Sequence, residues 1–405
     1  MNLPARTVYF GLEFALSIPA FVVTAVYFVR VVHMSPLQLV LIGTVMEATV
    51  FLFEIPTGAF ADTYGRRRSL IVSFLVQGAA TVLVGAVASF WVIAVAWAIW
   101  GFGYTFQSGA YEAWITDEVG VESVGDVFLR GTRIAYVGEL VGLAGAVGLA
   151  LWSLRAGVIA GGLVLVACGI AAALVMPETG FVRRPVEERG SAFSEVARTA
   201  MSGASHIRAR PLLLLLLAAA FFAGMSSEAF DRLRDAHFIR DIGLPRVGSL
   251  DPVIWFGLLG VCVLVAGLVG STYLIKRAAR GGAERIARLL LVLTAALAGA
   301  EVVFALSGSI ALALGALVVA RLARSLASPL YLTWLNRRID DSSVRATVLS
   351  MSGQADAIGQ TAGGPVLGLI GNLYGIRVAL GAGAAVLLPA LGLYARAATR
   401  EHVDD

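Results

Sequence analysis

The chain has 405 residues, of which 58% are hydrophobic and only 14% are charged, and its formal net charge is +4. Soluble globular domains average about 25% charged residues, so this composition excludes an ordinary soluble enzyme or a soluble nucleic-acid-binding domain. The mean hydropathy is +0.83, and apolar runs of about twenty residues, each long enough to cross a bilayer as a helix, recur along the chain. We expect an all-α membrane protein with about twelve transmembrane helices.

In chain order, the apolar runs form two sets of six. The first set comprises residues 7–32, 37–60, 69–88, 91–115, 130–151 and 157–176, and the second comprises 212–231, 253–275, 286–306, 310–335, 345–370 and 376–394. This order predicts an N-terminal six-helix bundle (1–180), a cytoplasmic linker (181–210) and a C-terminal six-helix bundle (211–405). The first run holds Glu13 and is too long for the apolar core of a signal peptide, so we expect no cleavable leader.

Alternate loops between the runs differ in their content of arginine. The richer set includes Arg66, Arg67 and Arg68 after the second run. Because short loops rich in Arg and Lys stay in the cytoplasm, this distribution places both termini there. The pI near 9.3 therefore reflects topology and does not indicate a nucleic-acid partner. Lys276 is the only lysine, and this arginine bias favours a GC-rich bacterial genome and hence the inner (plasma) membrane.

No residue pattern indicates a metal site, a cofactor or an enzyme. The four histidines are scattered without the spacing of metal ligands, and no GxxxxGK[ST] nucleotide-binding loop occurs. Cys168 and Cys262 lie in apolar runs of different halves, so we expect two buried packing thiols and no disulfide. The expected partners are a small-molecule substrate, protons and the lipid bilayer, and we expect a monomer.

The two halves share short motifs in the same order. Tyr111 and Trp114 of the fourth run match Tyr331 and Trp334 of the tenth. The fifth run contains Arg130, Gly138 and Gly148, and the eleventh contains Arg345, Gly353 and Gly363 at the same spacing. An even number of helices in each half predicts a parallel repeat, with a substrate site near the bilayer midplane where the halves meet.

One loop carries a family resemblance. The stretch Gly58-Ala-Phe-Ala-Asp62-Thr-Tyr-Gly65-Arg66-Arg67-Arg68 resembles the signature loop of the major facilitator superfamily. The stretches Glu54-Ile-Pro-Thr-Gly58, Tyr111-Glu112-Ala-Trp114 and Met176-Pro-Glu-Thr are similar to its drug:proton antiporter (multidrug efflux) branches. The resemblance implies two six-helix bundles and transport by alternating access.

The same resemblance implies that Asp62 is a cytoplasmic gate. Its carboxylate would face the N-terminus of the eleventh helix, whose positive end stabilises an acid. Gly58 and Gly65 would permit the tight turn, and Arg66 and Arg67 would complete the loop. The chain departs from these branches elsewhere, because the fourth run has no arginine and a Gly-Pro pair occurs in the eleventh run instead of the fifth.

Charged side chains within membrane spans are costly and therefore need a reason. The candidates for proton coupling are Asp356, Glu139, Glu47, Glu54 and Glu112. Asp356 leads because Ser352 and Gln360 share its helix face and a glycine-rich stretch follows it. A permanent ion pair with Arg321 or Arg324 would instead make Asp356 structural, and Glu228 with Arg232 suits an intrahelical pair.

Polar and aromatic residues of the fourth and tenth runs are candidates for substrate binding. They are Tyr104, Gln107, Tyr111, Arg321, Arg324 and Tyr331. The alternative is that the aromatic stripe packs inside the protein or faces lipid. Aromatic rings beside carboxylates suit lipophilic cations. The sequence therefore predicts a secondary active transporter that exports hydrophobic or cationic small molecules against protons. The alternatives are a proton-coupled symporter that imports a metabolite and a non-transporting membrane sensor or scaffold.

Overall fold

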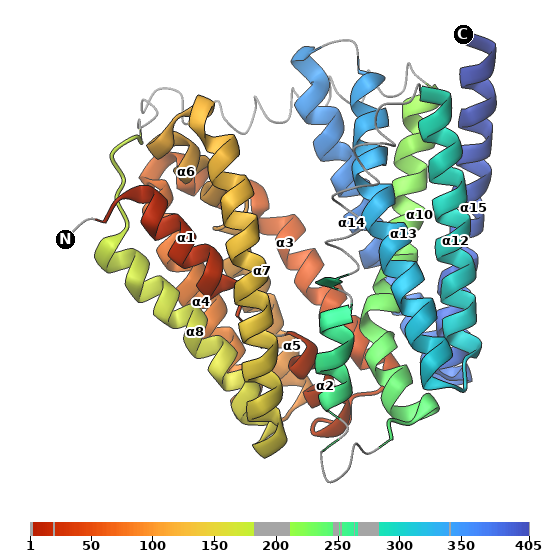
Figure 1. Ribbon diagram of the computed structural model, residues 1–405, viewed down its shortest axis with the longest axis horizontal. Coiled ribbons are helices and arrows are strands. Elements are labelled where there is room, and N and C mark those ends of the chain that lie inside the picture. The colour runs from red at the N-terminus through yellow and green to blue at the C-terminus, as the bar shows by residue number, and fades with distance from the viewer. Residues whose placement is uncertain are drawn as a thin grey trace. The chain divides into compact units, whose positions relative to one another are not determined.

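The computed structural model describes residues 3–18, 21–181, 211–245, 251, 253–262, 264–265, 283–339 and 342–404. All the regular elements in these ranges are helices (Figure 1), and nine candidate spans among them are long and apolar enough to cross a membrane. The expected all-α membrane fold is therefore confirmed. The other three expected spans correspond to a broken pair of short helices, to the segment 253–275, of which only residues 253–262 and 264–265 are described, and to α14 (Ser342–Tyr374).

Contacts divide the chain into two compact units. Unit 1 comprises Met1–Met34, Val45–Ala192 and Pro245–Gly260, and unit 2 comprises Ser35–Thr44, Phe193–Leu244 and Val261–Asp405. The helices that begin in the first half of the chain are α1 (Ala5–Leu16), α2 (Phe21–Arg30), α3 (Pro36–Tyr64), α4 (Arg66–Ala86), α5 (Phe90–Thr105), α6 (Ala110–Val119), α7 (Val121–Trp152) and α8 (Leu154–Val175). The first part of α3 thus belongs to unit 2. Residues 182–210, nearly all of the expected linker, lie outside the described residues.

The expected fourth span is not continuous. It is broken between α5 and α6, where Gly109 adopts a left-handed conformation with φ +71°. The hydroxyl of Thr57 donates to the Thr105 carbonyl (3.1 Å) and that of Ser69 donates to the Phe106 carbonyl (2.6 Å). These bonds satisfy carbonyls at the break, which a membrane interior without water requires.

Glycines bring the helices of unit 1 into close contact. A Cβ at Gly138 would lie 2.2 Å from the Phe14 carbonyl oxygen, and one at Gly142 would lie 2.0 Å from that of Ile18. Only a residue without a side chain allows α7 to approach α1 this closely. Around this contact, Tyr9, Phe74 and Trp114 belong to the buried core of unit 1.

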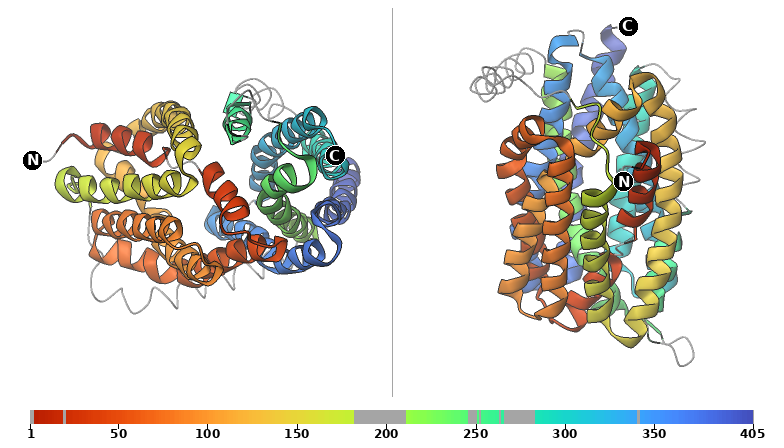
Figure 2. Two further views of the ribbon diagram at one scale, coloured as in Figure 1. Left: turned by 90° about the horizontal axis from the view of Figure 1, so that it is seen from below. Right: turned by 90° about the vertical axis from the view of Figure 1, so that its left-hand side faces the viewer.

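The helices of unit 2 form a bundle, which the left view of Figure 2 shows nearly end-on. They are α10 (Pro211–His237), continued by a π-helical turn at Phe238–Ile242, then α12 (Ala283–Leu306), α13 (Ile310–Arg337), α14 and α15 (Ile376–Asp404). A Cβ at Gly359 of α14 would lie 2.0 Å from the Phe221 carbonyl oxygen, and one at Gly363 would lie 2.2 Å from Cγ of Met225. The α10–α14 contact is therefore as close as the α1–α7 contact.

The first residues of α7 and α14 show that one glycine match of the expected repeat needs correction. Gly138 and Gly142 lie 17 and 21 residues after Val121, where α7 begins, and Gly359 and Gly363 lie 17 and 21 residues after Ser342, where α14 begins. Gly138 thus corresponds to Gly359, and the match of Gly138 with Gly353 was wrong. The short shared motif misled because glycines are frequent in both helices, whereas close helix contact selects particular ones.

The aromatic part of the repeat agrees with the structure. The Tyr111 hydroxyl donates to the Tyr9 carbonyl (3.4 Å) in α1, and the Tyr331 hydroxyl donates to the Leu216 carbonyl (3.1 Å) in α10. Both tryptophans that follow these tyrosines are fully buried. Of the two cysteines, Cys168 is buried as expected, but Cys262 is exposed, so the expectation of a buried thiol was wrong there.

Candidate functional site

The signature loop joins α3 to α4 through a strained turn. Gly65 has φ +107°, a conformation that disfavours any residue with a Cβ. A Cβ there would also lie 2.8 Å from the Glu178 carboxylate, which accepts a hydrogen bond from the Arg67 backbone N–H (2.8 Å). Glu178 thus holds the first turn of α4, where a carboxylate also meets the positive end of the helix.

The loop arginines bind neighbouring parts of unit 1. Arg66 forms an ion pair with Asp117 of α6 (2.8 Å), and the Arg67 guanidinium donates to the Ala173 carbonyl (2.5 Å). Trp114 donates its indole N–H to the Pro177 carbonyl (2.8 Å). The signature loop, the end of the fourth run and the Met176–Thr179 stretch therefore meet in one cluster. Gly58 and Asp62 lie on the last turns of α3, partly buried, and the gate role of Asp62 stays a prediction.

Sequence reasoning missed two members of this cluster, Asp117 and Glu118. The Glu118 carboxylate accepts hydrogen bonds from the backbone N–H groups of Thr179 (2.5 Å) and Gly180 (2.8 Å). The available signal was the pair of acids at the end of α6, which two spans separate from the arginine run at Arg66–Arg68. Because their partners are distant in sequence, spacing along one helix did not reveal them.

A second set of predicted residues gathers around Tyr104 in unit 1. Tyr104 is 39% exposed, and its ring stacks on Trp100 at a centroid distance of 5.7 Å and an interplanar angle of 8°. The carboxylates of Glu112, Glu54 and Glu47 all act electrostatically on its hydroxyl. We call these five residues, which come from α3, α5 and α6, the acidic-aromatic patch. Next to it, the Ser108 hydroxyl donates to Glu54 (3.1 Å).

The remaining predicted residues of unit 1 lie elsewhere. Tyr111 is buried and stacks on Tyr9 at 5.4 Å, and both hydroxyls reach the Glu13 carboxylate. Gln107 lies in the break between α5 and α6, where its side-chain oxygen accepts a hydrogen bond from Gln77 (3.2 Å). Glu139 is exposed on α7. The aromatic residues of this span therefore divide into a packed part at Tyr111 and Trp114 and a part with an exposed Tyr104 and a partly buried Trp100.

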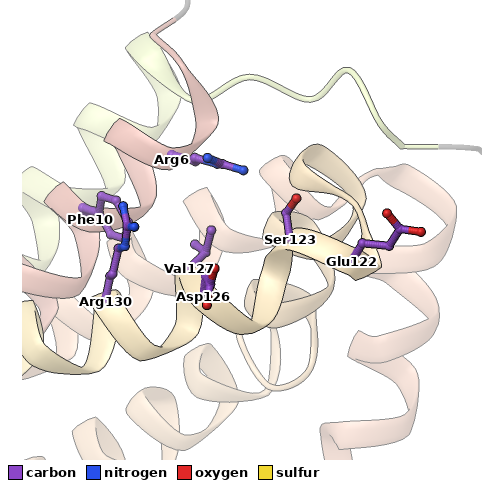
Figure 3. Close-up of a pocket in the computed structure, with 7 residues that line it drawn as sticks. All are labelled: Arg6, Phe10, Glu122, Ser123, Asp126, Val127 and Arg130. Atoms are coloured by element: carbon purple, nitrogen blue, oxygen red, sulfur yellow. The ribbon is translucent and has the colours of Figure 1, made fainter.

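A cavity of about 170 Å³ lies where α1 and α7 begin. In Figure 3 its lining side chains project from these two helices; they are Arg6, Phe10, Glu122, Ser123, Asp126, Val127 and Arg130. None of the residues predicted to bind substrate or protons lines this cavity. Among the described residues, no group of three or more His, Cys, Asp or Glu side chains could hold a metal ion.

Unit 2 contains an ion network centred on Arg324 of α13. The Arg324 guanidinium binds Asp231 of α10 at 2.8 Å and Glu301 of α12 at 3.5 Å. The Ser226 hydroxyl donates to the other oxygen of Glu301 (3.0 Å), and Arg321 lies 4.0 Å from Asp231. We call Ser226, Asp231, Glu301, Arg321 and Arg324 the Arg324 network.

The network shows the ion partners of two arginines that were predicted to bind substrate, and that predicted role stays a prediction. Arg324 forms its ion pairs with Asp231 and Glu301, whereas Asp356 accepts a hydrogen bond from Gln360 (2.7 Å). The expected alternative, a direct ion pair of Asp356 with Arg321 or Arg324, is therefore absent from the described contacts. The intrahelical pair of Glu228 with Arg232 is present at 3.0 Å. Tyr331 binds the Ser352 hydroxyl of α14 (2.7 Å) as well as α10.

Sequence reasoning did not select Asp231 or Glu301. Glu301 is the only acid in the apolar part of its run, and such an isolated acid is itself a signal. Its partners come from α10 and α13, so only the packing of three helices reveals that it shares an arginine with Asp231.

Comparison with known proteins identifies the same architecture. A family model described as Major Facilitator Superfamily matches residues 7–363. The "Uncharacterized MFS-type transporter YxaM" of Bacillus subtilis (strain 168) is 28% identical over 106 residues, which are 26% of this chain and 27% of that protein.

Solved structures resemble nearly the whole chain. A bacterial homologue of the human lysosomal transporter Spinster has a TM-score of 0.73 at 16% identity, with 98% of this chain and 96% of that chain covered. The nucleoside transporter NupG has a TM-score of 0.71 at 10% identity, covering 98% and 99%. A POT family transporter in complex with 5-aminolevulinic acid has a TM-score of 0.73 at 11% identity, covering 96% and 94%. At these identities the likeness concerns the fold alone.

Proposed function

This chain belongs to the Major Facilitator Superfamily and is therefore a membrane transporter and not an enzyme, and we propose that it exports amphipathic organic cations in exchange for protons. The single observation that carries the substrate class is the acidic-aromatic patch. Three carboxylates act electrostatically on the exposed Tyr104, whose ring stacks on Trp100, and none of the five residues of the patch is basic.

The patch suits a flat organic cation for two physical reasons. A cation over an aromatic face gains about 0.5–2 kcal/mol, more as water is excluded. Carboxylates add a charge attraction that grows as the effective dielectric constant falls. A neutral or anionic substrate would gain neither interaction and would have to approach three carboxylates within the membrane, which is costly.

Proton coupling supplies the driving force in this proposal. A pH difference of one unit supplies about 1.4 kcal/mol per proton, and 100 mV adds about 2.3 kcal/mol per charge. A carboxyl that binds either a proton or the substrate converts this energy into transport, because the two ligands compete for it. Export, as opposed to import, rests on the resemblance of three motif stretches to the drug:proton antiporters.

The test uses the purified protein in proteoliposomes, with ethidium as a flat, permanent cation and a pH-sensitive dye in the lumen. We expect ethidium to accumulate only with a pH gradient, and protons to move in the opposite direction. Protons that move together with the substrate would favour a symporter. Movement of neutral or anionic compounds without ethidium would contradict the cation proposal.

Variants of the patch connect this activity to its residues. We expect Glu54→Gln to raise the KM for ethidium about tenfold or more, the effect of about 1.4 kcal/mol. Tyr104→Ala should raise it about fivefold, the effect of a cation–π contact near 1 kcal/mol. Glu122→Gln is the matched control, because it removes an exposed carboxylate outside the patch. An equal effect of Glu122→Gln would indicate general surface charge and contradict the site.

A further inference from the structure

The charges of unit 2 do not balance. Two ion pairs lie within α10, Glu228 with Arg232 at 3.0 Å and Arg234 with Asp235 at 3.2 Å, and Arg234 also lies 3.8 Å from Asp231. The other groups around the middle of the unit are three carboxyls (Asp231, Glu301 and Asp356) and two guanidiniums (Arg321 and Arg324), so that five carboxyl groups in all face four guanidinium groups. With one carboxyl in excess, one of the three can be neutral without leaving an arginine unpaired.

Geometry distinguishes Glu301 from the other two carboxyls. It is 1% exposed, whereas the Asp231 side chain is 39% exposed with its Oδ1 atom buried, and Asp356 is partly exposed. Arg324 makes its short contact with Asp231 (2.8 Å) and only a long one with Glu301 (3.5 Å). A buried carboxylate needs a closely placed cation to stay ionised. Of the two carboxyls that contact Arg324, Glu301 therefore gives up the weaker ion pair when it becomes neutral.

The second oxygen of Glu301 has a partner that suits both protonation states. The Ser226 hydroxyl donates to this oxygen (3.0 Å). A hydroxyl can donate to a carboxylate and can also accept from a protonated carboxyl. Glu301 therefore keeps a hydrogen bond whether or not it carries a proton, which avoids the cost of an unsatisfied buried group.

Every helix packed around Glu301 contributes charged or titratable groups. Asp231 of α10 and Arg324 of α13 act on it directly, and Asp356 of α14 acts on Arg324. One turn beyond Glu301, the His237 ring binds the Phe304 carbonyl (3.0 Å). Arg377 of α15 binds the Ser307 carbonyl (3.4 Å). Both of these groups hydrogen-bond to backbone oxygens. Arg324 is therefore the cation that forms an ion pair with Glu301.

We infer that Glu301 is the carboxyl that binds and releases the coupling proton, with Arg324 and Ser226 as positioning residues. A proton from water adds to the Glu301 oxygen that faces Ser226, an O–H bond forms there, and the Ser226 hydroxyl accepts from it where it had donated to the carboxylate. Arg324 then stays on Asp231, and its remaining charge acts on Asp356. Loss of the proton restores the carboxylate and its contact with Arg324. This inference rests on the proposed proton-coupled transport and assigns it a residue.

The first test needs no substrate. In the purified protein in nanodiscs, infrared spectroscopy follows the C=O band of protonated carboxyl groups as the pH is raised from acid to alkaline. We expect a band that titrates in the wild type and in Asp356→Asn but is absent from Glu301→Gln. A titrating band that survives in Glu301→Gln, or that disappears in Asp356→Asn, would overturn the assignment. Because no transport is measured, this test decides about Glu301 even if ethidium is not a substrate.

The second test separates coupling from structure. In proteoliposomes, Glu301→Gln should lose pH-driven accumulation of ethidium about tenfold or more but keep ethidium exchange at equal pH on both sides. Loss of both activities in a folded protein, or loss of neither, would contradict the inference. If Glu301→Gln does not fold, Ser226→Ala takes its place. We expect this variant to shift the pH at which the infrared band and the transport titrate, and an unchanged pH profile would contradict the inference.

Discussion

The two units use the same helical frame but carry different charges. In unit 1 the Tyr111 hydroxyl binds a carbonyl of α1, and in unit 2 the Tyr331 hydroxyl binds a carbonyl of α10. Close glycine contacts join α1 to α7 and α10 to α14 in the same way. The acidic-aromatic patch of unit 1, however, consists of carboxylates and aromatic rings, whereas the acids of unit 2 share guanidinium groups.

This difference shows which parts of a repeated fold are free to diverge. Helix contacts made by glycine and by a buried tyrosine depend on close packing, which tolerates little change. A carboxylate can instead be stabilised by hydroxyl groups and a ligand or by a fixed arginine. A carboxylate that only hydroxyl groups contact can bind an incoming cation. A carboxylate that a fixed arginine contacts is part of an internal ion network. On this basis we assign cation recognition to unit 1 and proton binding to unit 2.

The largest effect is expected for Arg324→Met, which breaks the network of unit 2. Glu301 would lose its cation and Asp231 its shortest ion pair, and breaking a buried ion pair costs about 3–5 kcal/mol. We expect a loss of unfolding free energy at the lower end of that range, because Asp231 is partly exposed. The measurement is thermal unfolding of the purified protein by tryptophan fluorescence.

Unit 1 provides the control for this variant. Arg30 binds Asp251 at 2.6 Å, but both side chains are more than one-third exposed, so Arg30→Met should cost less than about 1 kcal/mol. Adding Asp231→Asn to Arg324→Met should recover part of the loss. Equal losses of unfolding free energy in Arg324→Met and Arg30→Met would mean that the ion pairs of the two units contribute equally to stability.

The second-largest loss of stability is expected for Gly→Ala variants at the close helix contacts, and it should be equal in both units. Gly142→Ala and Gly359→Ala would each place a Cβ 2.0 Å from a carbonyl oxygen of the facing helix, and overpacking costs about 1–3 kcal/mol. Gly145→Ala and Gly353→Ala are the matched controls, because nothing lies within 4 Å of the added Cβ. Thermal unfolding of the four variants tests the equivalence, which fails if the controls are as unstable as the contact variants.

The signature loop of unit 1 carries the next prediction. Asp62→Asn should slow transport about tenfold, equivalent to about 1.4 kcal/mol, with normal membrane insertion, because the turn at Gly65 and the ion pair of Arg66 with Asp117 remain. Ethidium transport and surface expression are measured together, with Asp126→Asn as a control outside the loop. Normal transport by Asp62→Asn would leave the loop arginines as topology signals alone.

The smallest effects are expected for Tyr111→Phe and Tyr331→Phe. Each removes hydroxyl hydrogen bonds to a neighbouring helix, and a typical hydrogen bond contributes about 0.5–1.5 kcal/mol. We expect Tyr331→Phe to cost more, because its contacts are shorter (2.7 and 3.1 Å against 3.4 Å). The measurement is the unfolding free energy of both variants. A loss in one variant and no change in the other would contradict the structural equivalence of the two tyrosines.

The sequence determined the all-α membrane fold and the paired aromatic motifs, because both are local. Each membrane span must be an apolar run about twenty residues long to satisfy its own backbone, so spans are read directly from the chain. The motif at Ser108–Trp114 recurs at Ser328–Trp334 with the same spacing. The signature loop is likewise a continuous stretch.

Only the tertiary structure decided the breaks, the glycine pairs and the ion partners. The break before Gly109 depends on hydroxyls from α3 and α4 that satisfy its carbonyls. Gly359 differs from Gly353 only in what it faces. Glu301 lies 23 residues from Arg324 and 75 from Ser226, and no periodicity connects positions on three helices. A charge in a membrane is stabilised by whichever group packing brings near it, so its partner is a property of the packed bundle and not of the span that carries it.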